Sequence, residues 1–110
     1  MKKVITYDNL PQLIKHLKAG KAILVLVGGC FDILHLGHIR FLNQAKKYGT
    51  LIVALESDEK LTRLKGVNRP IHTQLQRAEI LTSLNYVDYV LLLPTLTTDQ
   101  EYFNFTKKVS

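Results

Sequence analysis

The chain contains the sequence Gly28-Gly29-Cys30-Phe31-Asp32-Ile33-Leu34-His35-Leu36-Gly37-His38, which joins an apolar run, residues 22–27, to an amphipathic segment that begins near Ile39. This order predicts a buried strand, a glycine turn and a helix that begins at two histidines three residues apart. Glycines allow the backbone to approach a phosphate, and a helix N-terminus attracts anions. Histidines on one helix face can donate to phosphate oxygens and are readily protonated near neutral pH. The pattern therefore indicates a binding site for a nucleoside triphosphate.

Apolar spacing on either side of this turn predicts an alternation of helices and strands. We expect helices over 8–20, 37–48, 58–64 and 74–84, and strands over 22–27, 51–55 and 87–93. The first helix begins near Asp8 or Asn9, has Pro11 in its first turn and ends at Gly20; Thr73 caps the last one. We therefore predict an α/β fold, a Rossmann-like parallel sheet with flanking helices, whose strands end at one ligand-binding rim.

Length and composition limit the class of protein. The 110 residues predict one domain, with an N-terminal helix over 8–20, a core over 22–93 and an atypical polar tail over 94–110. The net charge of +6 fits either a solvated basic surface or attraction of polyanions, but the cations are scattered, which argues against a nucleic-acid-binding arm. A single cysteine excludes an internal disulfide. No run suits a signal peptide or a membrane span, so we expect a cytoplasmic protein without a membrane partner.

The chain resembles the nucleotidyltransferase superfamily that carries a His-x-Gly-His signature, here His35-Leu36-Gly37-His38. Further blocks that match this superfamily follow in the same order: Ser57-Asp58, Arg63-Leu64-Lys65-Gly66, Arg69-Pro70-Ile71, Gln76-Arg77 and Tyr86-Val87-Asp88. The resemblance covers about residues 20–93. It is strongest to the adenylyltransferases of sugar phosphates, notably the heptose-1-phosphate adenylyltransferase domain of ADP-heptose synthesis. Glycerol-3-phosphate cytidylyltransferases are also similar.

The resemblance implies a reaction and a set of partners. A phosphate of a small acceptor attacks the α-phosphorus of ATP or CTP, and pyrophosphate leaves. Mg²⁺ is expected, held mainly by the nucleotide phosphates and water, with no metal ligands assigned to the protein. The Arg-Leu-Lys-Gly and Arg-Pro-Ile blocks favour ATP over CTP, by resemblance alone.

The resemblance also implies roles for individual residues. Its catalytic residues are His35, His38 and Lys65; Asp32 and Arg69 bind the acceptor; and, besides the two histidines, the nucleotide-binding residues are Gly28, Gly29, Cys30, Phe31, Gly37 and Arg77. Several side chains fit a structural role as well. Cys30 fits a small buried residue as well as a reactive thiol, Phe31 fits core packing, and Asp32 fits a residue that orients a loop. Ser57 and Asp58 fit the cap of a short helix.

The chain also departs from the family. Glu56 stands where close relatives usually carry asparagine. The additional strand and Ser-Thr-Thr segment of family members have no match. We therefore expect a sheet that is truncated at its C-terminus, with an open edge that favours a homo-oligomer, most simply a dimer. A catalytically incomplete nucleotide-binding domain, or a fragment that needs a partner segment, is therefore the alternative to an enzyme. An RNA-linked role, as in class I aminoacyl-tRNA synthetases, is disfavoured because their Lys-Met-Ser-Lys-Ser loop is missing; we expect no nucleic-acid partner.

Overall fold

Apolar segments expected to be strands form most of a four-stranded parallel sheet in the order β1-β4-β3-β2. The structure is a computed structural model that describes residues 3–110. Its strands are β1 (Val4–Thr6), β2 (Leu24–Gly29), β3 (Thr50–Leu55) and β4 (Tyr89–Leu92). Its helices are η1 (a 3-10 helix, Tyr7–Asn9), α1 (Leu10–Ala19), α2 (Leu36–Lys46), α3 (Asp58–Lys65), α4 (Gln74–Thr82) and α5 (Asp99–Val109). The predicted α/β, Rossmann-like parallel sheet with flanking helices is confirmed.

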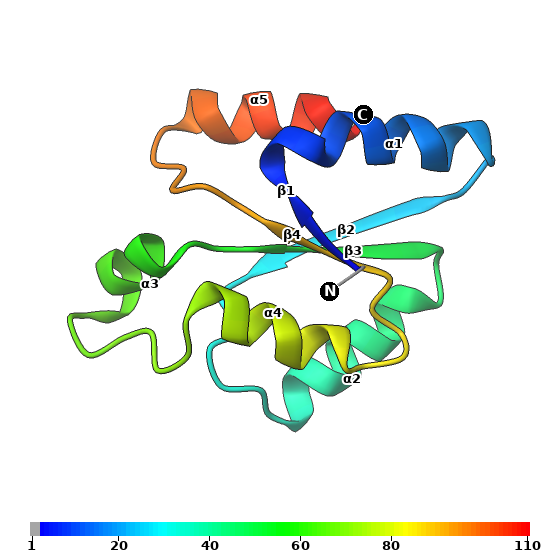
Figure 1. The fold of residues 1–110 in the computed structure, drawn as a ribbon. Coiled ribbons are helices and arrows are strands. Elements are labelled where there is room, and N and C mark those ends of the chain that lie inside the picture. Colours follow the sequence, from blue (N-terminus) through cyan, green and yellow to red (C-terminus); the bar gives the residue numbers. More distant parts are fainter. Residues whose placement is uncertain (1–2) are drawn as a thin grey trace.

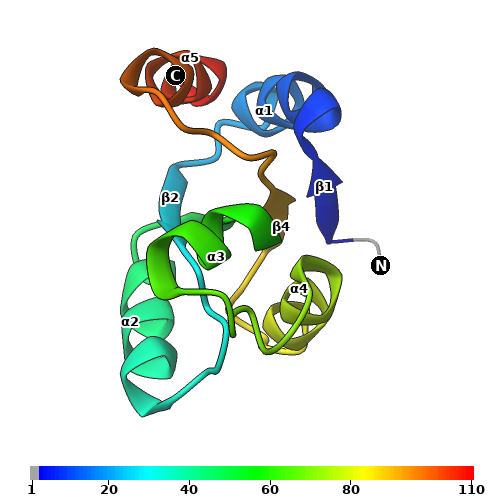
Figure 2. The same ribbon diagram turned by 90° about the vertical axis from the view of Figure 1, so that its left-hand side faces the viewer.

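Helices cover both faces of the sheet. Helices α1 and α5 lie on one face and α2 and α4 on the other, while α3 lies beyond the carboxyl ends of the strands (Figure 1). Figure 2 shows the same layers from the side of α3. The side chains of β3 alternate between two cores, as the pleat of a strand requires: Leu51, Val53 and Leu55 face one, and Ile52 and Ala54 the other.

The strand β1 was not expected from the sequence. It spans only Val4–Thr6 and pairs in parallel with β4, with Val4 opposite Val90. Three residues are too few to show an alternation of apolar and polar side chains. The following helix accordingly begins later than predicted, at Leu10, with Pro11 in its first turn and Gly20 at its end as expected.

The tail over 94–110 is not irregular, because its second half forms α5. Thr98 caps this helix and shares a capping box with Glu101. Phe105 is buried in the core that α5 shares with α1. The pattern Thr98-x-x-Glu101, followed by apolar residues at Tyr102, Phe105 and Val109, carried the signal in the sequence.

Strand β2 forms one edge of the sheet. Within residues 3–110 it pairs with β3 alone, and its apolar residues 24–27 remain partly exposed. Ile23, immediately before it, is 69% exposed. The glycine turn therefore emerges from an edge strand, on the open side of the sheet. No helix in the described part of the chain is long and apolar enough to cross a membrane.

Candidate functional site

A cavity of about 560 Å³ lies beyond the carboxyl end of β2, at the position predicted for the ligand. It is lined by Gly28, Gly29, Cys30, Phe31, Asp32, Ile33, His35, His38, Phe41, Lys65 and Arg69. The structure therefore brings together the predicted site residues except Gly37 and Arg77. Ile33 and Phe41 line the cavity without having been predicted; both are large apolar side chains that remain half exposed, which the sequence does not distinguish from ordinary helix or turn residues.

Gly29, the second glycine of the turn, is required there for a steric reason. Phe31 adopts a left-handed backbone conformation, with φ of 46°, and its ring folds back over Gly29. A Cβ atom on Gly29 would lie 2.8 Å from that ring, closer than real contacts allow. The Phe31 ring is 6% exposed and packs in the core, and it also lies 5.3 Å from the imidazole of His38. Phe31 thus serves core packing and supports a histidine of the cavity at the same time.

The two histidines start α2 and are held by its backbone. Nδ1 of His35 accepts a hydrogen bond from the N–H of Gly37 at 3.0 Å, and Nδ1 of His38 accepts one from the N–H of His35 at 3.2 Å. The two rings stack with 3.9 Å between their centroids. Because Nδ1 accepts in both rings, the proton of each neutral imidazole resides on Nε2. Each histidine therefore offers an Nε2–H donor to a ligand in the cavity.

Gly37 contributes to the same arrangement although it lies outside the cavity lining. A Cβ atom at this position would lie 2.8 Å from Cε1 of His35. The absence of a side chain lets the His35 ring lie against the backbone of α2 and accept from the N–H of Gly37. Gly37 is thus placed to shape the histidine pair rather than to face a ligand.

The charge environment keeps His38 neutral in the free protein. Burial, the neighbouring His35 and the positive charge of Lys65 all lower the pKa of His38. Its ordinary value of about 6.5 already leaves a histidine mostly neutral at pH 7. His38 in the free protein is therefore harder to protonate than an ordinary histidine.

Asp32 holds the loop between α3 and α4, residues 66–73, against the glycine turn. Its carboxylate is 3% exposed, accepts from the backbone N–H groups of Ile71 and His72, and pairs with Nε of Arg69 at 2.5 Å. Burial alone would raise the pKa of Asp32, but these hydrogen bonds and the arginine charge lower it to about 2. Asp32 thus orients the loop and sets the position of Arg69 at the cavity.

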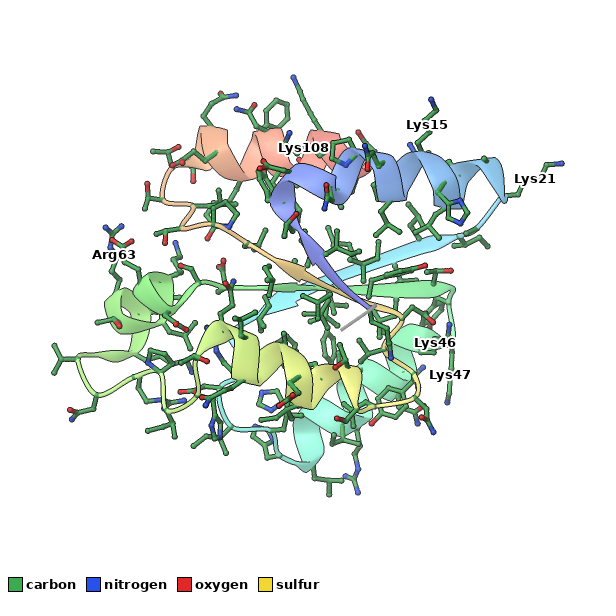
Figure 3. The ribbon with its side chains drawn as sticks, in the orientation of Figure 1. Lys15, Lys21, Lys46, Lys47, Arg63 and Lys108 are labelled. Atoms are coloured by element: carbon green, nitrogen blue, oxygen red, sulfur yellow. The ribbon has the colours of Figure 1, made fainter. Side chains whose placement is uncertain are left out.

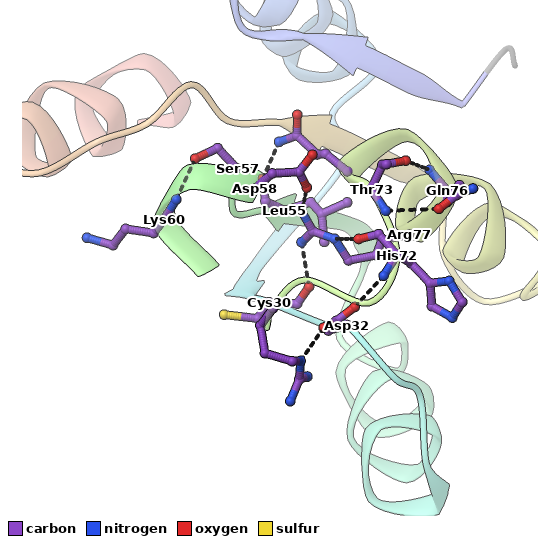
Figure 4. Close-up of polar contacts among 12 residues, drawn as sticks. Cys30, Asp32, Leu55, Ser57, Asp58, Lys60, His72, Thr73, Gln76 and Arg77 are labelled. Carbon is purple, nitrogen blue, oxygen red and sulfur yellow. Dashed lines mark hydrogen bonds and ion pairs between the residues drawn. The ribbon is translucent and has the colours of Figure 1, made fainter. Parts of the chain in front are cut away.

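Arg77, expected from the resemblance to contact nucleotide, is instead surrounded by protein. Its side chain is fully buried. Nη1 donates to the carbonyl of Cys30 at 2.7 Å, Nε to the carbonyl of His72 at 3.1 Å, and Nη2 to Oδ1 of Asp58 at 2.7 Å (Figure 4). The guanidinium reaches the site through the backbone of the turn rather than by lining the cavity.

Gln74 is a residue of the site region that sequence reasoning missed. Its Nε2 donates to the carbonyls of Leu55 and Leu93, both at 2.9 Å, at the ends of β3 and β4. Glutamine in the first turn of a helix is common, so its type gave no signal. Its spacing of three residues from Arg77, which places both on one helix face, was the available clue.

The remaining polar residues near the strand ends have structural partners. Ser57 caps α3 by accepting from the N–H of Lys60, and its hydroxyl also contacts that of Thr95 at 2.7 Å. Oε2 of Glu56 accepts from the hydroxyl of Tyr102 at 2.9 Å, whereas Oε1 is buried without a partner in the described residues. Glu56, the residue that departs from the family, is thus bound to α5.

Cys30 does not have the environment of an activated thiol. Burial raises the pKa of its thiol; the charge of Glu56 also raises it, against the opposing effects of Lys65, Arg77 and Arg69. A reactive cysteine needs a lowered pKa, because the thiolate is the nucleophile. The structure favours the interpretation of Cys30 as a small, inert residue of the turn.

The donors around the cavity suit phosphate oxygens better than a metal ion held by the protein. Among residues 3–110 no group of three or more histidine, cysteine, aspartate or glutamate side chains could hold a metal. Asp32 is the one carboxylate of the cavity lining, and both its oxygens are occupied. Other cations are spread over several elements and do not line the cavity, as Figure 3 shows for Lys15, Lys21, Lys46, Lys47, Arg63 and Lys108. Lys65 and Arg69 are the lysine and arginine that line the cavity.

The sequence of this chain is similar to those of known proteins. The bifunctional protein HldE of Helicobacter hepaticus is 48% identical over 90 residues, which cover 81% of this chain and 18% of that protein. HldE of Campylobacter jejuni is 41% identical over 100 residues, 90% of this chain and 22% of that protein. The chain thus spans about a fifth of the length of these curated relatives.

Structural comparison agrees. A lipopolysaccharide core biosynthesis protein from Thermoplasma volcanium has a TM-score of 0.65 and 30% sequence identity, over 76% of this chain and 68% of that one. The cytidylyltransferase-like family matches residues 26–109, which extends beyond the expected region of resemblance into α5. The chain therefore belongs to the cytidylyltransferase-like family, a family of nucleotidyltransferase enzymes.

Proposed function

We propose that this protein transfers a nucleoside monophosphate from ATP to the phosphate of a small acceptor, a sugar phosphate above all, with release of pyrophosphate. The observation that carries the proposal is the stacked pair of His35 and His38, whose Nε2–H donors flank a cavity that also contains Lys65 and Arg69. ATP is preferred to CTP because the sequence blocks around these two cations resemble those of sugar-phosphate adenylyltransferases.

The proposed chemistry needs alignment and charge stabilisation rather than a protein nucleophile. An oxygen of the acceptor phosphate forms a bond to the α-phosphorus, the bond to the β-phosphate oxygen breaks, and pyrophosphate leaves with that electron pair. The backbone of the glycine turn and the histidine Nε2–H donors hold the triphosphate oxygens, while Lys65 offsets the charge that develops on the leaving group. Arg69, held by Asp32, is the candidate contact for the acceptor phosphate.

Magnesium remains part of the proposal. The lining offers donors for phosphate and no free carboxylate, so Mg²⁺ would be held by the phosphates and by water. Bound there, it would neutralise part of the phosphate charge. His35, His38 and Lys65 would orient the triphosphate that carries it.

A second candidate is a nucleotide-binding domain that does not turn over alone. The position of β2 favours it, because the edge strand leaves one side of the cavity region without a neighbouring strand in the described residues. Binding would then be retained while turnover is weak.

One pair of measurements separates these functions. ATP and CTP are titrated by calorimetry with MgCl₂, and pyrophosphate release is followed with a panel of sugar 1-phosphates that includes a heptose 1-phosphate. ATP binding with acceptor-dependent release supports the transferase. Binding without release supports the second candidate, and no binding of either nucleotide contradicts both.

Two variants show whether the cavity is responsible. His38→Ala removes one donor and is expected to lower the rate by about 10²-fold or more. Arg63→Lys is the matched control: its side chain is exposed and pairs with Glu59 on the outer face of α3. Equal activity in wild type and His38→Ala would remove His38 from the proposed mechanism.

A further inference from the structure

The first turn of α4 carries two side chains that reach across the ends of three strands. Gln74 bonds to the carbonyls of Leu55 and Leu93, at the ends of β3 and β4. Arg77 bonds to the carbonyl of Cys30, directly after β2. The two residues are three apart and therefore lie on one face of the helix. Together they bind the carboxyl edge of the sheet from β2 to β4.

Arg77 also connects the segments that carry the cavity's cations. Its bond to Asp58 fixes the start of α3, and Lys65 is the last residue of that helix. Its bond to His72 fixes the loop between α3 and α4, which contains Arg69. The turn also contacts this loop directly, because Asp32 accepts hydrogen bonds from the backbone N–H groups of Ile71 and His72. Arg77 thus joins the backbones of the turn and the loop, and it joins them to α3 through the side chain of Asp58.

A fully buried arginine is costly unless its charge is paired and hydrogen-bonded, and here each of the three guanidinium nitrogens donates a hydrogen bond, at 2.7 to 3.1 Å, one of them to the carboxylate of Asp58. A lysine could fill the same space, but its single ammonium could not reach three acceptors in fixed directions. The planar guanidinium therefore sets distances between the glycine turn, α3 and the loop that no other side chain would reproduce.

We propose that Gln74 and Arg77 are positioning residues of the active site: they fix the glycine turn relative to Lys65 and Arg69 so that the donors are organised before substrate binds. This inference rests on the proposed nucleotidyl transfer. It reassigns Arg77 from nucleotide contact to positioning and gives Gln74 a role that the sequence did not suggest.

Misplacement of these donors should harm the chemical step more than substrate binding. Transition-state stabilisation requires donors within about 0.5 Å of the productive geometry, and a displacement of about 1 Å can cost 10²-fold in rate. Ground-state binding of a flexible triphosphate tolerates larger displacements of the donors. Loosening the turn should therefore lower kcat more than it raises KM for ATP.

The test compares Arg77→Lys with Arg63→Lys, an exposed arginine on the neighbouring helix. Rates are measured at a temperature well below the unfolding midpoint of each variant, so that only folded protein contributes. We expect kcat of Arg77→Lys to fall by about 10²-fold, KM to change by a few-fold, and Arg63→Lys to match wild type. A purely structural role would lower the midpoint and leave kcat of the folded protein unchanged, which would overturn the inference.

Two milder variants keep the test valid if Arg77→Lys does not fold. Gln74→Met keeps the volume and removes both hydrogen bonds, so its kcat should fall with KM little changed. Asp58→Asn keeps an acceptor oxygen for Arg77 at a half-exposed position and should retain most of the activity. Wild-type kcat in Gln74→Met would contradict the role of Gln74.

A measurement without substrate separates this inference from the proposed function. Amide hydrogen exchange at residues 30–32 should quicken by about tenfold in Arg77→Lys, the expected effect of losing one net hydrogen bond, and not in Arg63→Lys. Unchanged exchange would overturn the positioning role even in an active enzyme. If the wild-type protein transfers no nucleotide, the proposed function is overturned. The exchange result still decides whether Arg77 orders the turn.

Discussion

His35 and His38 stack with 3.9 Å between their ring centroids, and each uses Nδ1 to accept a backbone N–H at the start of α2. The same contacts that begin the helix thus determine which ring nitrogen faces a ligand. A helix cap and a pair of phosphate donors are built from the same two side chains. This double use explains why the histidines stand three residues apart and why a glycine lies between them.

Nucleotide binding should change the protonation of His38. Burial, His35 and Lys65 hold the pKa of His38 below its usual value, so the ring is neutral at pH 7 in the free protein. Triphosphate charge favours the imidazolium, so ATP should raise this pKa and binding should take up protons. Titration of the Cε1–H signal by NMR with and without ATP measures the change, and the exposed His16 on α1 serves as the internal control. An NMR titration that gives the same pKa for His38 with and without ATP would contradict contact between His38 and phosphate.

The stability of the free protein should respond to pH in the same region. Because the folded pKa of His38 lies below the unfolded value of about 6.5, the unfolded chain binds more protons as the pH falls through that range. His38 therefore contributes stability above about pH 6.5 that is lost on acidification. ATP, by raising the folded pKa, should reduce this loss.

Gly37 does not line the cavity, but its substitution should displace the ring of His35, which does. In Gly37→Ala the new Cβ would meet Cε1 of His35, so the ring must move and its hydrogen bond to the backbone is lost. We expect ATP binding to weaken and the free energy of unfolding to fall by about 1 kcal/mol, the usual value of a lost cap. Gly20→Ala is the control, because a Cβ there meets only ordinary contacts near 3.6 Å. If both variants bind ATP like wild type, the geometry of His35 is not needed for binding.

Asp32→Asn should separate the loop-orienting role of Asp32 from contact with the acceptor. The folded pKa of about 2 lies below the ordinary 3.8, so the ionised carboxylate contributes up to about 2 kcal/mol above pH 4, lost as the pH falls from about 4 toward 2. The variant should lack this part of the acid dependence in urea unfolding measured against pH. Arg69 would lose its ionised partner, so acceptor KM should rise more than ATP KM. An acid dependence identical to wild type would show that Asp32 is not the group responsible.

The site was easier to predict from the sequence than its surroundings. The turn, both histidines, Lys65 and Arg69 meet at one cavity because parallel strands deliver their carboxyl ends to one rim, which follows from the order of strands and helices. Arg77 differs because the resemblance predicts that its guanidinium contacts the nucleotide, whereas the structure turns it toward the backbone and Asp58. That distinction depends on burial and on three acceptors far apart in sequence.

At the ends of the chain, prediction from the sequence is limited for a different reason. Strand β1 is too short for a period to be visible, and it forms only because β4 presents a free edge for Val4–Thr6. Its pairing is long-range, between residues more than 80 apart, and local patterning carries no trace of it. The homo-oligomer expected from an open sheet edge stays a prediction; the edge strands of the described sheet are β1 and β2.

The packing of α5 should contribute strongly to stability. Phe105 is 6% exposed and packs among residues of α1 and the sheet, so Phe105→Ala should lower the free energy of unfolding by about 3 to 5 kcal/mol. Phe103→Ala, two residues earlier and 53% exposed, is the matched control and should cost well under half as much. Urea unfolding followed by circular dichroism measures both. Similar small losses in the two variants would mean that α5 is not docked on α1 in solution, and the bond from Tyr102 to Glu56 would then be lost as well.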